Sequence, residues 1–221
     1  MLIEICASTY QSAINAQKGG AHRIELCENL KVGGVTPSYA LIKQVVAELN
    51  IPINVLIRPR GGDFVYSDDE FNRMLSDIED SKSISYNGIV SGVLNPDNTI
   101  DIERTRQLIE ASKPKSFTFH RAFDETSDPI GSLKMLMELG VERILTSGQA
   151  TTAIEGLKTL KKLHKKANEE VTILVGGGVR SSNVLQFTLA GFNEVHSSAI
   201  ENSEQHSNLA QIQNLIRIAN H

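Results

Sequence analysis

Polar residues suited to chemistry gather where an apolar, strand-like segment ends. The stretch LIRPRGGDF (56–64) passes from apolar residues through Arg58, a proline and Arg60, and reaches Asp63 after two glycines. Two guanidinium groups close together in the sequence are suited to binding a carboxylate or a phosphate. The stretch therefore predicts a site for a small anion, provided that the fold brings the end of this strand to a binding surface.

A second candidate is the stretch FHRAFDE (119–125), which puts His120 at the end of another apolar segment, followed by Arg121 and Asp124. An imidazole at such a position can act as a general base or a general acid. The competing interpretation is a histidine that only completes a hydrogen bond inside the fold. The residue types leave both interpretations open.

Glycine-containing stretches follow two further apolar segments, LTSGQA (145–150) and VGGGV (175–179). Consecutive glycines expose backbone N–H groups, which can bind an anion. The competing interpretation is a tight turn. The residues that these stretches would contribute to an anion site are Ser147, Gly176, Gly177 and Gly178.

The elements that must position these residues alternate regularly along the chain. Short apolar runs typical of strands are each followed by a helical pattern. The strand-like runs are 2–6, 23–27, 53–58, 88–94, 116–121, 142–147, 171–176 and 194–199, and helical patterns follow at 9–19, 38–50, 67–80, 101–112, 128–140, 151–169, 181–192 and 207–220. This order predicts an α/β fold, a single (β/α)8 TIM barrel over residues 1–221. An open doubly wound sheet would require a G-x-G-x-x-G after an early strand, which the sequence lacks.

Alternation along the strands predicts an unusually polar barrel interior. If Ile3 and Ile5 face the helices, Glu4 and Cys6 face inward, because successive side chains of a strand point to opposite faces. The same reasoning turns a larger set of side chains inward, namely Glu25, Cys27, Arg58, Thr118, His120, Glu194, His196 and Ser198. Buried charges must be paired. We therefore expect Arg58 to neutralise Glu4 and Glu25.

Composition excludes several functional classes. The formal net charge is −4, which gives no general attraction to nucleic acid or to anionic lipid. No apolar run is long enough to span a membrane, and the N-terminus carries Glu4 where a signal peptide would be apolar. The two cysteines, Cys6 and Cys27, do not form a C-x-x-C motif, which favours reduced thiols in the cytosol. We expect a cytoplasmic protein that binds neither nucleic acid nor membranes.

The residues that could bind a metal ion are Cys6, Cys27, His120 and His196. Thiolates favour soft ions such as Cu(I), or Zn(II). Two neighbouring strands would bring Cys6 and Cys27 close together, because each lies two residues after a glutamate. No standard spacing of a closed zinc site is present. On residue type alone, each cysteine is better explained as a small buried apolar side chain.

The motifs resemble those of the CutC copper-homeostasis family. The resemblance runs in order along nearly the whole chain, through EIC near the start, GGAHRIELC at 19–27, IRPRGGDFVYS at 57–67, FHRAFD at 119–124 and GGGV at 176–179. It implies a cytoplasmic (β/α)8 barrel that forms a homo-oligomer, such as a dimer, and that takes part in copper homeostasis. It also implies that Cys6 and Cys27 are the Cu(I) ligands.

Two functional hypotheses follow. The first is a copper-homeostasis protein that binds Cu(I) through Cys6 and Cys27. The second is an acid–base enzyme acting on a small anionic substrate, phosphorylated molecules included, at the carboxyl ends of the strands. In the second hypothesis the catalytic residues are His120, Arg58, Asp124 and Glu25, and the anion-binding residues are Arg60, Asp63, Arg121, Ser147, Gly176, Gly177 and Gly178.

Overall fold

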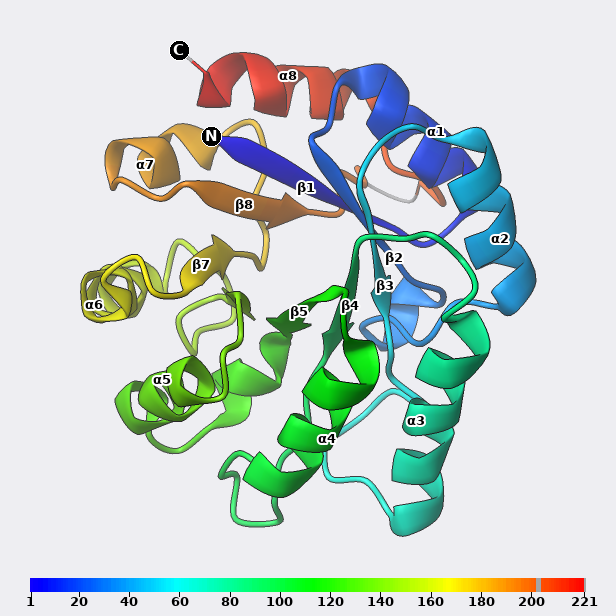
Figure 1. Ribbon diagram of the computed structural model, residues 1–221. Helices are drawn as coiled ribbons and strands as arrows, with labels where there is room; N and C mark the ends of the chain where they lie inside the picture. Colours follow the sequence, from blue (N-terminus) through cyan, green and yellow to red (C-terminus); the bar gives the residue numbers. More distant parts are fainter. Residues whose placement is uncertain (202–203, 221) are drawn as a thin grey trace.

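The computed structural model describes residues 1–201 and 204–220 and shows a closed barrel of eight parallel strands in sequence order. Each strand is followed by a helix that packs outside the barrel (Figure 1), which confirms the predicted (β/α)8 fold. The strands are β1 (Leu2–Ala7), β2 (Arg23–Leu26), β3 (Ile53–Leu56), β4 (Gly88–Ser91), β5 (Ser116–Phe119), β6 (Arg143–Thr146), β7 (Thr172–Val175) and β8 (Glu194–Ser197). The helices are α1 (Tyr10–Gly19), α2 (Tyr39–Glu48), α3 (Asp68–Ser81), α4 (Ile102–Ser112), α5 (Pro129–Glu138), α6 (Leu157–Ala167), α7 (Val184–Leu189) and α8 (Leu209–Ala219), with short 3-10 helices η1 (Leu30–Val32) and η2 (Arg121–Glu125).

Helix α3 illustrates how local sequence sets the boundaries of the helices. Ser67 accepts a hydrogen bond from the backbone N–H of Glu70, and the Glu70 carboxylate accepts one from the backbone N–H of Ser67. This capping box satisfies two donors that the first turn leaves without intrahelical partners. Phe71, Met74 and Ile78 then recur at helical spacing on the buried face. The helix therefore begins at a sequence signal and is held by its apolar side.

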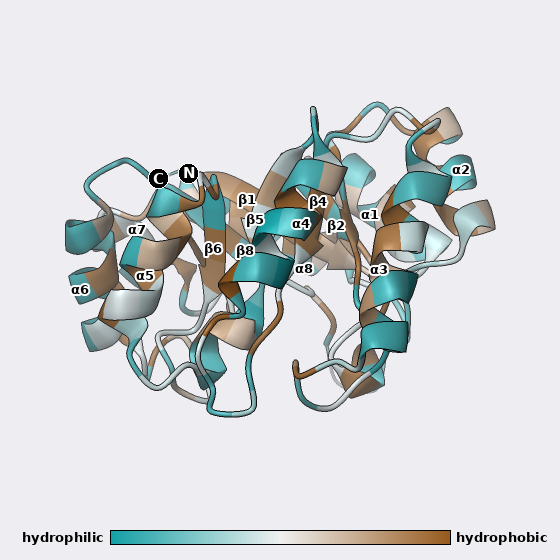
Figure 2. Cartoon of the chain, turned by 60° about the horizontal axis from the view of Figure 1, so that its bottom comes forward, coloured by the Kyte–Doolittle hydropathy of each residue, from teal (hydrophilic) through white to brown (hydrophobic). Residues whose placement is uncertain are grey.

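The buried apolar side chains form two clusters, one between the sheet and the helices and one inside the barrel. Ile3 and Ile5 belong to the large cluster between strands and helices. In Figure 2 brown, hydrophobic segments run along the strands, and the helices around them carry both teal and brown turns. A second, small cluster contains Cys6, Cys27, Leu56 and Val90. The predicted alternation is thus confirmed for β1, with Cys6 inside the barrel and its isoleucine neighbours outside.

The ring of helices closes where α8 lies between α7 and α1 (Figure 1). The chain ends meet there, because the amino group of Met1 donates a hydrogen bond to Asn220 Oδ1 at 3.2 Å. Along the described residues, every helix is too short or too polar to pass through a bilayer.

Candidate functional site

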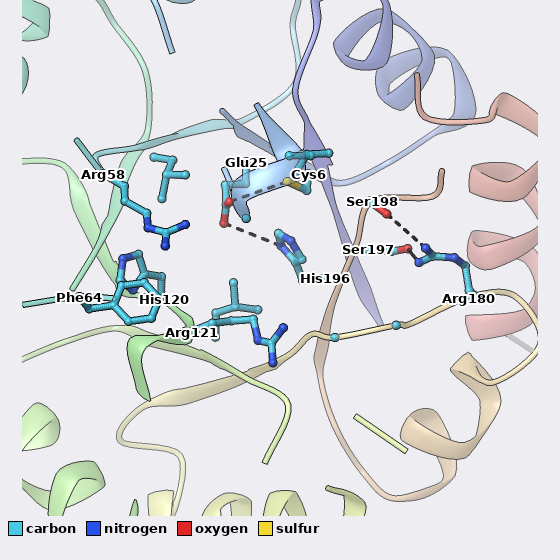
Figure 3. Close-up of a pocket in the computed structure, with 16 residues that line it drawn as sticks. Cys6, Glu25, Arg58, Phe64, His120, Arg121, Arg180, His196, Ser197 and Ser198 are labelled. Carbon is cyan, nitrogen blue, oxygen red and sulfur yellow. Dashed lines mark hydrogen bonds and ion pairs between the residues drawn. The ribbon is translucent and has the colours of Figure 1, made fainter. Parts of the chain in front are cut away.

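A pocket opens at the carboxyl ends of the strands, the face where active sites of this fold lie. It has a volume of about 210 Å³, which suits a small molecule. Its polar lining comes from strand ends and loops on several sides of the barrel (Figure 3), and includes Cys6, Glu25, Arg58, His120, Arg180 and His196.

A buried network of charges lies beneath the pocket. Arg23 on β2 pairs with Glu4 on β1 and with Glu194 on β8. Glu4 also contacts His196, with 2.7 Å between Glu4 Oε1 and His196 Nδ1. Burial alone would raise the pKa of Glu4, but the hydrogen bond with His196 and the charge of Arg23 lower this pKa to about 2. Glu4 is therefore a carboxylate at neutral pH despite complete burial.

Glu25 is the carboxyl group that faces the pocket. Its Oε2 lies 3.9 Å from His196 Nδ1 and has no hydrogen-bond partner among the described residues. Burial raises the pKa of Glu25 to about 7, although the charge of His196 opposes this shift. For His196, burial favours the neutral form, yet the charge of Glu25 and the hydrogen bond with Glu4 raise its pKa well above the ordinary value. The pocket therefore holds an imidazolium next to a carboxyl group that titrates near neutrality.

The two cysteines meet inside the barrel. Cys6 Sγ lies 3.5 Å from Cys27 Sγ and 3.9 Å from Glu25 Oε1. Cys6 lines the pocket, whereas Cys27 is fully buried behind it. The hydrogen bond with Cys27, together with burial, raises the pKa of Cys6 well above its ordinary value. Ligand atoms of Cys6, Glu25 and His196 also lie within 4.8 Å of one another, so the cluster offers a thiol, a carboxylate and an imidazole to a metal ion.

The expected pairing of Arg58 with Glu4 and Glu25 is wrong. Arg58 Nη1 donates hydrogen bonds to the carbonyls of Val32 and Gly34, at 3.0 Å each, and Nη2 donates to Gly62 O at 2.7 Å. The reason is that β3 ends at Leu56, so the Arg58 side chain lies among the loops at the mouth rather than inside the barrel. Arg23, one strand away, takes the role expected of Arg58.

His120 lies against the same loop. Its ring packs against Phe64 at a tilt of 52°, with 4.8 Å between centroids, and the Arg58 guanidinium lies 4.7 Å from the Phe64 ring centre. His120 Nδ1 accepts a hydrogen bond from the backbone N–H of Ala122, while Nε2 has no partner among the described residues. Burial, helped by the charge of Arg58, lowers the pKa of His120 to about 3. The imidazole is therefore neutral at pH 7 and carries its proton on Nε2.

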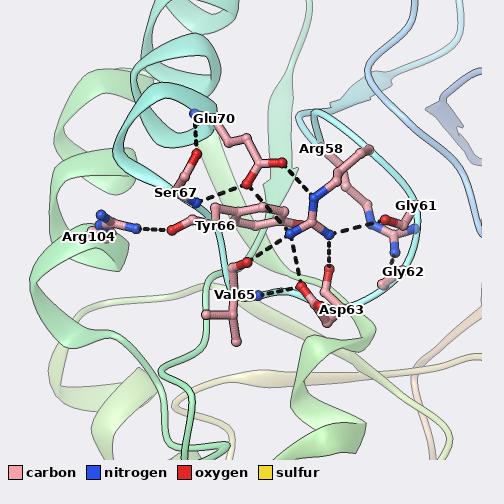
Figure 4. A network of polar contacts seen from close by, with 10 residues as sticks. Arg58, Gly61, Gly62, Asp63, Val65, Tyr66, Ser67, Glu70 and Arg104 are labelled. Atoms are coloured by element: carbon pink, nitrogen blue, oxygen red, sulfur yellow. Dashed lines mark hydrogen bonds and ion pairs between the residues drawn. The ribbon is translucent and has the colours of Figure 1, made fainter.

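Arg60 and Asp63 do not reach this pocket. Arg60 binds Glu70 at 2.6 Å and Asp63 at 3.0 Å, and also donates to the carbonyl of Val65. Figure 4 shows these three partners around the loop that connects β3 to α3. Arg60 therefore connects its own loop to the start of α3. Of the two arginines in the stretch 56–64, Arg58 lines the pocket and Arg60 lies outside it.

Asp124 organises the loops after β5 and β6. Its carboxylate accepts hydrogen bonds from Arg121 Nε at 2.8 Å, from the hydroxyl and backbone N–H of Ser147, and from the backbone N–H of Gln149. Arg121 Nη2 in turn donates to Ser147 Oγ at 2.9 Å. Gly156 makes this close packing possible, because a Cβ on Gly156 would lie 1.8 Å from the carbonyl oxygen of Ser147. Of this group, Arg121 lines the pocket.

The glycine run after β7 also borders the pocket. Gly177 and Gly178 line it, with φ angles of 100° and 75° that favour glycine. A Cβ on Gly177 would come within 2.9 Å of Ser147 Cβ. Gly176 precedes these two glycines and lies beneath the pocket, where a Cβ would collide with the Leu145 side chain.

Sequence reasoning missed two arginines. Arg23 has the same parity in its strand as Glu25, so extending the alternation two residues back would have revealed it. Arg180 follows the glycine run by two residues and lines the pocket, but a single arginine in a loop carries no periodic signal.

Comparison with known proteins gives a consistent family. A model of the CutC family matches residues 1–201. A relative from Parabacteroides distasonis named as a family protein CutC is 48% identical over 200 residues, which is 90% of this chain and 82% of the relative. A protein of the same name from Salmonella typhimurium is 44% identical over 198 residues, covering 90% and 79% of the two chains.

Solved structures support the same family and the same fold. A crystal structure named for the copper homeostasis protein CutC of Streptococcus agalactiae superposes with a TM-score of 0.84 at 38% identity, covering 90% of this chain and 98% of that one. Phosphoribosylanthranilate isomerase from Thermotoga maritima has a TM-score of 0.63 at 14% identity, covering 100% and 98%, which is a likeness of fold alone.

Proposed function

The chain belongs to the CutC family, and from that premise we propose that it serves copper homeostasis by binding Cu(I) between Cys6 and Cys27. The observation that carries the proposal is the distance of 3.5 Å between the two sulfur atoms. Two sulfurs that each lie about 2.3 Å from one metal ion are at most about 4.6 Å apart, so both thiolates can share an ion with little movement. Thiolates are also the ligands that select Cu(I).

The charges around the cysteines support this choice of ion. Two thiolates and one Cu(I) carry a single net negative charge. An imidazolium at His196 offsets that charge, since its nitrogen lies within 4.8 Å of Cys6 Sγ. A buried charge requires such a partner. Glu25, with a pKa of about 7, limits the repulsion because it can remain protonated.

The alternative ligand set is Cys6, Glu25 and His196. Carboxylate and imidazole are harder ligands than thiolate and suit ions such as Zn(II) better than Cu(I). His196 would also have to give up a proton that Glu4 and Glu25 stabilise. The two sets share Cys6 and differ in Cys27, Glu25 and His196, so substitutions of Cys27 and of His196 separate them.

The test is anaerobic titration with Cu(I) against a competing chelator. We expect the wild type to bind one ion, Cys6→Ser and Cys27→Ser each to weaken binding at least about tenfold, and the double variant to abolish it. His120→Phe is the matched control, because it changes the same pocket without removing a thiol. Binding that survives in Cys27→Ser and is lost in His196→Asn would overturn the two-cysteine site.

Acid–base catalysis in the same pocket is the second candidate, and the pKa of Glu25 favours it. A carboxyl group with a pKa of about 7 is available in both protonation states at neutral pH. In this proposal Glu25 carries the proton, and neutral His120 donates a hydrogen bond to the substrate through Nε2. The test is a nuclear magnetic resonance screen of small phosphorylated carbonyl compounds for deuterium uptake from D2O. Uptake that requires Glu25 and is lost in Glu25→Gln would support the candidate.

A further inference from the structure

Three guanidinium groups line the pocket, and the described residues pair only one of them with a carboxylate. Arg121 binds Asp124. Arg58 and Arg180 have no carboxylate within salt-bridge distance in the described ranges 1–201 and 204–220. Among the described residues that line the pocket, Glu25 is the single acidic one, so positive charge prevails around the cavity.

Arg180 is half-buried and bound to neutral oxygens. Its Nη1 donates to the carbonyl of Val179 at 2.8 Å and to Ser197 Oγ at 3.3 Å, and its Nη2 donates to Ser198 Oγ at 3.3 Å (Figure 3). Burial lowers the pKa of Arg180, although the charge of Glu201 opposes this. A half-buried cation whose hydrogen bonds all go to neutral oxygens gains from a bound anion.

Arg58 and His120 supply a second, independent observation. The Arg58 side chain is 5% exposed and its Nη atoms bind three backbone carbonyls, so its charge also lacks a counter-ion among the described residues. His120 is 4% exposed, lines the pocket, and has a buried Nε2 with no hydrogen-bond partner in the described part of the chain. A buried donor without a partner costs free energy that an oxygen atom of a ligand would recover.

The loop after β7 adds backbone donors. Within the described residues, the N–H groups of Gly177 and Gly178 donate to no protein oxygen. Asn183 holds this loop by donating to the carbonyl of Gly178 at 2.9 Å, and the backbone N–H of Ala153 donates to the carbonyl of Gly177 at 2.8 Å. The carbonyls of the loop are therefore engaged and its N–H groups remain available. Consecutive backbone N–H groups next to an arginine are typical of a phosphate site.

We infer that the pocket binds a small phosphorylated molecule, with its phosphate at Arg180 and the N–H groups of Gly177 and Gly178, and with an oxygen of its other end at His120 Nε2 beside Arg58. The cavity of about 210 Å³ limits the ligand to a small metabolite. The phosphate site and the cysteine pair have in common only the floor of the pocket, where Cys6 lies. Phosphate binding therefore does not depend on copper binding. It replaces Arg60 and Asp63 of the sequence-based hypothesis with Arg180.

The experiment is calorimetric titration of the full chain with 2-phosphoglycolate, inorganic phosphate and glycolate. We expect 2-phosphoglycolate to bind most tightly, inorganic phosphate more weakly, and glycolate least. Arg180→Met should weaken the binding of both phosphate probes at least about tenfold, because it removes a charged donor. Arg106→Met is the matched control, since Arg106 lies on the exposed surface of α4 and pairs with Glu103. Far-ultraviolet circular dichroism verifies that each variant is folded.

Two results would overturn the inference. One is that glycolate binds the wild type as tightly as 2-phosphoglycolate. The other is that Arg180→Met and Arg106→Met bind the phosphate probes equally well.

A measurement on the wild type keeps the inference testable if Arg180→Met does not fold. Cys6 lines the same pocket, so a bound ligand should cover its thiol. We expect 2-phosphoglycolate to slow the alkylation of Cys6 in a saturable way, and glycolate to have no effect at the same concentration. An unchanged alkylation rate at saturating 2-phosphoglycolate would equally overturn the site.

Discussion

Cys6 Sγ on β1 and Cys27 Sγ, one residue after the end of β2, lie 3.5 Å apart, yet they differ in their access to solvent. Cys6 borders the pocket at 4% exposure, whereas Cys27 is fully buried. An ion or a reagent that enters from the mouth therefore meets Cys6 first. The shared hydrogen bond keeps Cys6 in the thiol form, because a thiolate there would lose a donor and face burial.

This asymmetry predicts different rates of alkylation. In Cys27→Ser, iodoacetamide at pH 8 should react with Cys6 more slowly than with free cysteine, because burial still disfavours the thiolate, which is the reactive form. In Cys6→Ser, Cys27 should react more slowly still, until denaturant unfolds the chain. Mass spectrometry of timed samples measures both rates. Equal rates for the two cysteines would contradict the described burial.

Among the ion pairs, the buried network around Arg23 should contribute most to the free energy of unfolding. Arg23→Met leaves Glu4 and Glu194 without their shared guanidinium, and removal of one partner from a buried pair costs about 3–5 kcal/mol. Arg73→Met is the matched control, because Arg73 pairs with Asp77 on the surface of α3, where such pairs contribute about 0.3–0.5 kcal/mol. Urea unfolding measures both variants. Similar losses in the two variants would show that the buried network contributes little.

The sequence predicted the part of the site that follows from periodicity. Alternation places Glu4, Cys6 and Glu25 inside the barrel because a strand has only two faces and the apolar residues must face the helices. Alternation could not predict which arginine pairs with the buried carboxylates. Arg58 and Arg23 both lie near strand ends, and which one enters the barrel depends on where β3 stops.

Loop residues escaped prediction for a different reason. Arg60 and Arg180 each lie in a loop, and no pattern in the sequence tells which one faces the pocket. The answer depends on contacts distant in sequence, namely Glu70 at the start of α3 for Arg60 and Ser197 on β8 for Arg180. Such partners appear only once the fold brings the loops together.

Copper affinity should rise with pH if the cysteine pair is the site. Cys6 has a pKa raised well above its ordinary value, so Cu(I) must displace its proton throughout the physiological range. Each displaced proton makes the apparent affinity increase about tenfold per pH unit. Chelator competition at pH 6, 7 and 8 measures this dependence. An affinity that stays constant over this range would exclude thiols that are protonated before binding.

His120 and Glu25 should have opposite effects on how the free energy of unfolding changes with pH. His120 has a folded-state pKa of about 3 against an ordinary 6.5, so as the pH falls below 6.5 the unfolded chain gains the proton and stability decreases. Glu25 has a folded-state pKa of about 7 against an ordinary 4.5, so as the pH falls from 7 to 4.5 the folded chain gains the proton and stability increases.

The two effects act together between pH 6.5 and 4.5 and should nearly cancel in the wild type. Each slope is at most about 1.4 kcal/mol per pH unit, with opposite sign. His120→Phe should therefore become more stable as the pH falls through this window, and Glu25→Gln should become less stable. Urea unfolding at half-unit intervals of pH measures the slopes. Parallel profiles for the two variants would mean that at least one of these groups keeps its ordinary pKa in the folded protein.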